Sequence, residues 1–178
     1  MSDATRIFLV GPMGAGKTTI GRYLASALQL PFIDTDHEIE KRSGADIPWI
    51  FDVEGERGFR DREHKVLYDI CQSSPAVIAT GGGIVIREEN RQLLNQSGTS
   101  VFLQTSVSQQ LRRTCNDRSR PLLNEGDPAK TLRNLMIIRE PFYREVADII
   151  IATENNKPRL TAQSIVRALE SSHSLSKD

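Results

Sequence analysis

The residues with the clearest chemical potential form a glycine-rich loop that ends in a lysine and a threonine near the start of the chain. The segment 11–18 has the sequence G-P-M-G-A-G-K-T, which fits the pattern G-x-x-x-x-G-K-[ST] throughout. Glycines at this spacing let the backbone take positive φ angles and turn its N–H groups inward onto an anion. Lys17 can then reach the β- and γ-phosphates of a nucleotide, and the Thr18 hydroxyl can ligate the Mg²⁺ that bridges them. The segment therefore predicts a site for a nucleoside triphosphate and Mg²⁺.

The segments on either side of this loop are those that such a site requires. The apolar run 7–10 predicts a buried strand before the loop, and the segment 18–25 is compatible with a helix after it. A helix that begins here would add the positive end of its dipole to the phosphate site. The alternative is a glycine-rich turn followed by a chance Lys-Thr pair, and the flanking strand and helix argue against it.

Two carboxylates, Asp34 and Asp36, end a predicted second strand over 31–36. Residues i and i+2 of a strand project to the same side. If this strand lies beside the strand at 6–10, both carboxylates sit at the edge where open α/β sheets bind ligands. One carboxylate can then hold water on Mg²⁺ while the other accepts a proton from a substrate hydroxyl. A solvated turn or a helix cap is the alternative interpretation of this pair.

Three arginines and a glycine triplet add the features of an anionic acceptor site. Arg60, Arg120 and Arg139 offer guanidinium groups, which grip carboxylates and phosphates through two parallel hydrogen bonds. Glu63 lies one helical turn after Arg60 and can orient it, although an ordinary i,i+3 surface pair has the same spacing. The glycines 81–83 follow a buried-type strand at 76–79 and predict close approach of the backbone to a ligand, or else a tight strand-to-helix turn.

Strand and helix signals alternate along the whole chain, which predicts a parallel sheet with helices on both faces. The polar, turn-rich segment of about 116–126 predicts a mobile lid. The predicted strands cover 6–10, 31–36, 76–79, 100–103 and 149–151, and the predicted helices 17–29, 37–42, 47–51, 56–71, 87–95, 106–114, 127–146 and 161–171.

The amino-acid composition is typical of a single globular domain that spans residues 1–178. The chain has 178 residues, of which 38% are hydrophobic, and its 23 basic residues balance 23 acidic ones. Zero net charge argues against a nucleic-acid or polybasic membrane role, and no apolar run approaches a membrane span. Cys71 and Cys115 form no disulfide framework or zinc motif, and the segment 1–6 is too short and polar for a signal peptide. We therefore expect a cytoplasmic protein, and its small size is compatible with a monomer.

In order and spacing, the motifs together resemble the shikimate kinase family over nearly the whole chain. They are G-P-M-G-A-G-K-T, F-I-D-T-D, G-E-R-G-F-R-D-R-E, A-T-G-G-G, R-P-L-L and R-E-P-F-Y. The resemblance implies a three-layer P-loop kinase fold of class α/β, with a five-stranded parallel sheet flanked by helices and a mobile lid. It also implies ATP-dependent phosphorylation of the 3-hydroxyl of shikimate, a step toward chorismate and the aromatic amino acids.

The resemblance also implies roles for individual residues. Asp36 binds the attacking hydroxyl and is the candidate base, and Lys17 and Arg120 complete the catalytic set. Thr18 holds one Mg²⁺ directly, and Asp34 supports it through water. The implied ATP-binding residues are Gly14, Ala15, Gly16, Lys17, Thr18, Thr19, Arg113, Arg120, Asn156 and Pro158. The implied shikimate-binding residues are Asp36, Phe51, Phe59, Arg60, Gly81, Gly82, Gly83 and Arg139, several of them in a substrate-binding subregion at about 35–62.

Other nucleotide-binding classes fit the sequence less well. A GTPase would use D-x-x-G at 52–55 and N-K-x-D at 156–159, but the last position holds Arg159, so the carboxylate expected to bind guanine is missing. A nucleoside monophosphate kinase shares the loop and an arginine lid, yet it leaves the D-T-D pair and the glycine triplet unexplained. A non-catalytic nucleotide-binding domain would not need the residues required for catalysis, whereas in this chain every such motif position is filled.

Overall fold

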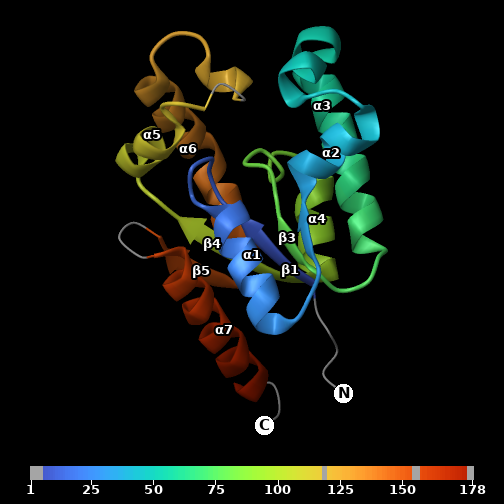
Figure 1. The fold of residues 1–178 in the computed structure, drawn as a ribbon, viewed down its shortest axis with the longest axis vertical. Helices are drawn as coiled ribbons and strands as arrows, with labels where there is room; N and C mark the ends of the chain where they lie inside the picture. Colours follow the sequence, from blue (N-terminus) through green and yellow to red (C-terminus); the bar gives the residue numbers. More distant parts are fainter. Residues whose placement is uncertain (1–5, 118–119, 154–156, 176–178) are drawn as a thin grey trace.

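A computed structural model describes residues 6–117, 120–153 and 157–175 and contains one five-stranded sheet (Figure 1). The strand order is β2-β3-β1-β4-β5, and every neighbouring pair is parallel. The strands are β1 (Arg6–Val10), β2 (Phe32–Asp34), β3 (Val77–Ala79), β4 (Gly98–Gln104) and β5 (Ile149–Ala152). The helices are α1 (Lys17–Leu28), α2 (Thr35–Ser43), α3 (Ile47–Cys71), α4 (Glu88–Ser97), α5 (Val107–Thr114), the 3₁₀ helix η1 (Pro121–Leu123), α6 (Pro128–Val146) and α7 (Pro158–Leu175).

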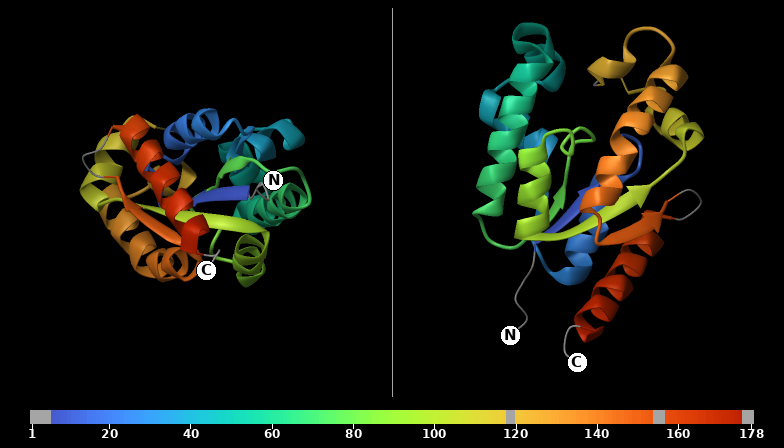
Figure 2. Two further views of the ribbon diagram at one scale, coloured as in Figure 1. Left: turned by 90° about the horizontal axis from the view of Figure 1, so that it is seen from below. Right: turned by 180° about the vertical axis from the view of Figure 1, so that it is seen from behind.

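Helices cover both faces of the sheet (Figure 2). The side chains of β1 alternate between the two resulting cores. Phe8 and Val10 pack with side chains of α3, α4 and α6, whereas Ile7 and Leu9 pack with side chains of α1 and α7. Such a strand is apolar along its whole length because both of its faces are buried. The three-layer α/β prediction is therefore confirmed. Within the described residues, no helix is both long and apolar enough to cross a membrane.

The predicted strand over 31–36 is wrong in its last two residues, which belong to α2, and the strand does not lie beside β1. β2 ends at Asp34, whose carboxylate accepts hydrogen bonds from the N–H groups of Asp36 and His37 at 3.0 and 3.2 Å. These bonds satisfy free donors of the first turn of α2, so Asp34 acts as a helix N-cap. Asp36 therefore lies in that first turn and does not share a strand face with Asp34. β2 pairs with β3, which separates it from β1.

The predicted helices 47–51 and 56–71 both form, and together they make α3. Asp46 caps the start of α3 by accepting from the N–H of Trp49 at 2.9 Å. Gly55 interrupts the helical backbone with φ 71°, a left-handed value that suits glycine. The final helix begins at Pro158, three residues earlier than predicted, because proline is well suited to the first turn of a helix.

Candidate active site

The loop 11–16 joins β1 to α1 and takes the conformation that its glycines permit. Gly14 and Gly16 have φ angles of 77° and 91°. The Nζ atom of Lys17 donates to the carbonyl oxygens of Gly11 and Pro12 at 2.7 and 2.8 Å. Burial lowers the pKa of Lys17 to about 7, and the positive charge of Arg120 acts in the same direction. The negative charges of Asp36 and Asp34 oppose this fall in the pKa, and an anion bound in the loop would act in the same direction as they do.

Thr18 and Asp34 are in direct contact beside the loop. The Thr18 hydroxyl donates to Asp34 Oδ2 at 2.7 Å. No group of three or more His, Cys, Asp or Glu side chains in the described residues is arranged to hold a metal ion. The Thr18 hydroxyl and the Asp34 carboxylate are oxygen groups of the kind that Mg²⁺ uses together with water and substrate phosphates.

Two adjoining pockets lie at the carboxyl end of the sheet. The loop pocket is lined by Gly14, Gly16, Lys17, Thr18, Thr19, Asp34, Asp36, Thr80, Gly81, Gly82, Arg113 and Arg120. The arginine pocket is lined by Met13, Asp36, Ile47, Phe51, Phe59, Arg60, Glu63, Gly81, Gly82, Gly83, Arg120, Pro121, Leu122 and Arg139. Both pockets include Asp36, Gly81, Gly82 and Arg120. A group bound in one pocket can therefore reach a group bound in the other across Asp36.

Two of the described residues predicted to bind ATP, Ala15 and Pro158, are absent from the lining of the loop pocket. The side chain of Ala15 is buried among the apolar residues of α1 and α7. Pro158 is exposed at the start of α7. Asn156 lies outside the described residues. Arg113 does line the pocket, and its guanidinium donates to the carbonyl oxygens of Gly14 and Thr153 at 2.8 and 3.3 Å.

Asp36 and Glu63 face the same glycine. A Cβ atom on Gly81 would lie 2.9 Å from Asp36 Oδ1 and 2.8 Å from Glu63 Oε2, so a larger residue here would have to displace the two carboxylates. Both oxygens are buried and have no hydrogen-bond partner within the part of the chain that the structure describes. Burial and the negative charge of Asp34 raise the pKa of Asp36, whereas Lys17 and Arg120 oppose the rise. Thr35 holds the arrangement together, because its hydroxyl oxygen accepts from the Gly81 N–H at 3.0 Å.

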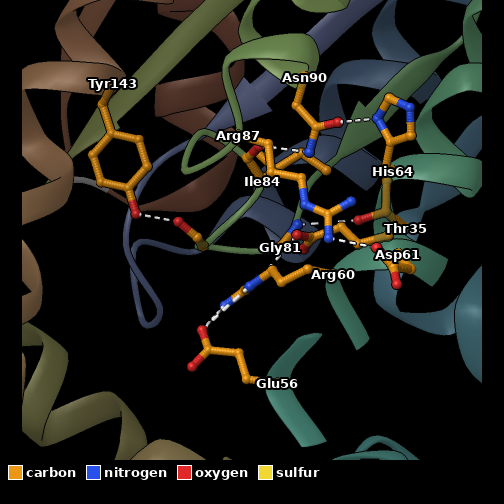
Figure 3. Close-up of polar contacts among 12 residues, drawn as sticks. Thr35, Glu56, Arg60, Asp61, His64, Gly81, Ile84, Arg87, Asn90 and Tyr143 are labelled. Atoms are coloured by element: carbon orange, nitrogen blue, oxygen red, sulfur yellow. Dashed lines mark hydrogen bonds and ion pairs between the residues drawn. The ribbon is translucent and has the colours of Figure 1, made fainter. Parts of the chain in front are cut away.

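Arg60 is held by two glutamates of its own helix, of which Figure 3 labels Glu56. Its Nη1 atom donates to Glu63 Oε1 at 2.9 Å, and its Nη2 atom donates to Glu56 Oε1 at 3.2 Å. The Glu63 side chain is fully buried, whereas Glu56 is half exposed. Burial raises the pKa of Glu63 to about 7 although the Arg60 charge opposes the rise. The i,i+3 pair in the sequence is thus a buried pair at the wall of the arginine pocket.

A set of polar residues that the sequence analysis missed supports the glycine triplet. Asn90 of α4 is buried, donates from Nδ2 to the Ile84 carbonyl oxygen at 2.9 Å, and is hydrogen bonded through Oδ1 to His64 Nδ1 at 2.7 Å (Figure 3). His64 belongs to α3, so this contact ties the segment after the triplet to the helix that carries Arg60. No motif marks these residues, because isolated histidines and asparagines have no characteristic spacing.

The parallel sheet, the phosphate-type loop and the adjoining arginine pocket define an enzyme class, that of P-loop phosphotransferases that act on an alcohol group of a small molecule. Comparison with known proteins then identifies the family. A sequence model described as shikimate kinase matches residues 13–170. The chain is 55% identical over 167 residues to a shikimate kinase of Chromohalobacter salexigens, an alignment that covers 94% of this chain and 93% of that one. It is 55% identical over 163 residues to a shikimate kinase of Pseudomonas syringae, covering 92% and 95%.

Solved structures agree with these sequence matches. A shikimate kinase from Acinetobacter baumannii in complex with shikimate superposes with a TM-score of 0.94 at 49% identity, covering 96% of this chain and 95% of that chain. A shikimate kinase from Aquifex aeolicus superposes with a TM-score of 0.83 at 36% identity, covering 95% and 98%. The chain belongs to the shikimate kinase family.

Proposed function

We propose that this enzyme transfers the γ-phosphoryl group of ATP to the 3-hydroxyl of shikimate, giving ADP and shikimate 3-phosphate. The observation that supports this most directly is the junction of the two pockets at Asp36. Lys17 lies on the loop side of this junction, whereas Arg60 and Arg139 lie on the other side. A triphosphate and an anionic acceptor therefore have complementary sites with one carboxylate between them.

On the loop side, transfer requires charge neutralisation and alignment more than covalent help. The loop N–H groups, Lys17 and Arg120 neutralise charge on the β- and γ-phosphate oxygens. Asp36 accepts a hydrogen bond from the substrate hydroxyl, aligns it for in-line attack and receives its proton. Mg²⁺, held by Thr18 and through water by Asp34, would supply further charge neutralisation between the phosphates.

On the acceptor side, Arg60 and Arg139 bind the shikimate carboxylate, and Gly81, Gly82 and Gly83 allow the ring to approach the backbone. Phe51 and Phe59 form the apolar wall, with ring centroids 4.8 Å apart. We assign substrate binding largely to a subregion at about 35–62 of a single domain, 1–178. Closure of a lid at about 116–126 would exclude water and limit hydrolysis of ATP.

The remaining assignments rest on the family resemblance. Arg113, Pro158 and Asn156 contact adenine, and Gly14, Ala15, Gly16 and Thr19 contact the phosphates through the backbone or side chain. We propose that the enzyme acts as a cytoplasmic monomer and binds neither nucleic acid nor a membrane.

A coupled assay of ADP release with Mg-ATP, run with and without shikimate, tests this function. We expect a large rate that depends on shikimate and a product that carries one added phosphate by mass. Omission of Mg²⁺ in the presence of a chelator should abolish that rate. ATP turnover that is indifferent to shikimate would refute the acceptor assignment and leave the nucleotide site in place.

A further inference from the structure

Tyr143 is a buried residue of α6 whose hydroxyl reaches the glycine triplet. Its ring stacks on Phe102 of β4, with centroids 5.2 Å apart, and the side chain is fully buried. The hydroxyl donates to the carbonyl oxygen of Gly82 at 2.5 Å (Figure 3). A side chain of the hydrophobic core therefore holds the middle glycine of a loop that lines the arginine pocket.

This hydrogen bond restrains the peptide group between Gly82 and Gly83. No peptide bond in the described ranges is cis, so the Gly82 carbonyl and the Gly83 N–H point in opposite directions. Over the residues that the structure describes, the Gly83 N–H has no acceptor, and both glycines line the arginine pocket. A free N–H beside two guanidinium groups is a natural donor to an anion.

Two of the three arginines that line the pocket, Arg60 and Arg139, pack against the same peptide group. A Cβ atom on Gly82 would lie 3.6 Å from Arg139 Nη1, and one on Gly83 would overlap the Arg60 guanidinium. Arg139 also lies one helical turn before Tyr143 on α6. Movement of the Gly82–Gly83 peptide would therefore disturb both guanidinium groups together.

The hydroxyl keeps its proton under ordinary conditions. Burial raises the pKa of Tyr143 to about 12, although the positive charge of Arg139 opposes the rise. The phenol is therefore neutral near pH 7 and retains the proton that it donates to Gly82.

We propose that Tyr143 is a positioning residue for recognition of the acceptor carboxylate, because it holds the Gly82–Gly83 peptide and thereby the two guanidinium groups packed on it. The proposal rests on the proposed function, in which Arg60 and Arg139 bind that carboxylate. Tyr143 itself contacts neither substrate nor the transferred group in this scheme.

The substitution Tyr143→Phe tests the proposal, because it keeps the ring on Phe102 and removes only the hydroxyl. We expect the KM for shikimate to rise about tenfold, which corresponds to the loss of one buried hydrogen bond. We expect kcat and the KM for ATP to stay within about twofold of the wild-type values. Tyr68→Phe, at an exposed position of α3, is the matched control and should change none of these constants.

A second acceptor separates recognition of the carboxylate from general damage. With the carboxamide of shikimate, wild type and Tyr143→Phe should have similar KM values, because the anionic group is absent from both complexes. A KM for shikimate within twofold of wild type would overturn the proposal, whatever the melting temperature. An equal rise in KM for shikimate and for its carboxamide would also overturn the proposal. So would a fall in kcat without a rise in the KM for shikimate. A wild-type enzyme that does not use shikimate would instead refute the proposed function.

Discussion

Arg60 and Glu63 form a buried ion pair, with Arg60 Nη1 2.9 Å from Glu63 Oε1, and the second oxygen of Glu63 faces Gly81 without a partner in the described structure. The pair serves two purposes in the site. It orients a guanidinium that we assign to substrate binding, and it places an acidic group next to Asp36. A buried ion pair of this kind contributes little net stability, so its geometry matters more than its energy.

The buried position of Glu63 predicts a pH dependence of stability. The pKa of Glu63 is about 7 in the folded chain, whereas the ordinary value for this carboxyl group is 4.5. The folded state therefore binds the Glu63 proton more tightly than the unfolded state does. The stabilisation that protonated Glu63 contributes to the unfolding free energy is fully present below pH 4.5 and is lost as the pH rises through about 7. In Glu63→Gln, the fall in unfolding free energy between pH 5 and pH 8 should be smaller than in wild type by about 2 to 3 kcal/mol.

Urea denaturation at both pH values measures this difference. Glu56→Gln is the matched control, because Glu56 pairs with the same arginine but is half exposed. If the unfolding free energy of wild type and of Glu63→Gln fell by the same amount between pH 5 and pH 8, the proton responsible for the pH dependence would belong to a group other than Glu63.

Asp36→Asn tests the assignment of the base. The amide keeps the shape of the side chain but cannot accept the proton of the substrate hydroxyl. We expect kcat to fall by about 10² to 10⁴, with ATP affinity retained. Single-turnover kinetics and calorimetric titration with ATP measure the two quantities, and Asp69→Asn on the surface of α3 is the control. A kcat near the wild-type value would exclude Asp36 as the base.

Arg139→Ala tests the carboxylate site. Arg139 is buried at the wall of the arginine pocket, so truncation removes a cation that water cannot readily replace. The KM for shikimate should rise about 30-fold or more, with a smaller change in the KM for ATP. Arg133→Ala removes an exposed arginine of the same helix and should leave both constants unchanged. An unchanged KM for shikimate in Arg139→Ala would show that the carboxylate is held elsewhere.

The lowered pKa of Lys17 predicts proton uptake when ATP binds. In the free enzyme this pKa is about 7, so at pH 8 most Lys17 side chains are neutral. Phosphates beside the ammonium raise the pKa, so binding at pH 8 should take up close to one proton, whereas binding at pH 6 should take up far less. Calorimetric titration with ATP in buffers of different ionisation enthalpy counts these protons. Zero uptake at pH 8 would contradict a direct contact between Lys17 and the phosphates.

The loop at 11–18 and the alternation of strands and helices could be predicted because both are local. A run such as 7–10 is apolar whichever strands lie beside it, and the glycines at 14 and 16 are needed for backbone angles that are set within a few residues. The limits of β2 were harder to predict, because the capping bonds of Asp34 compete with continuation of the strand. The sequence pattern of a strand end that carries carboxylates is the same as that of a strand followed by a capped helix.

The sequence by itself determined the chemical inventory of this protein, namely a phosphate loop, paired aspartates, separated arginines and a glycine triplet, because each is defined by residue types at short spacing. Only the tertiary structure decided which of these groups meet. Asp36 and Glu63 are 27 positions apart in the chain and flank one glycine, and Tyr143 reaches Gly82 across 61 positions. Such contacts depend on strand order and helix packing, which act over distances that sequence spacing does not encode.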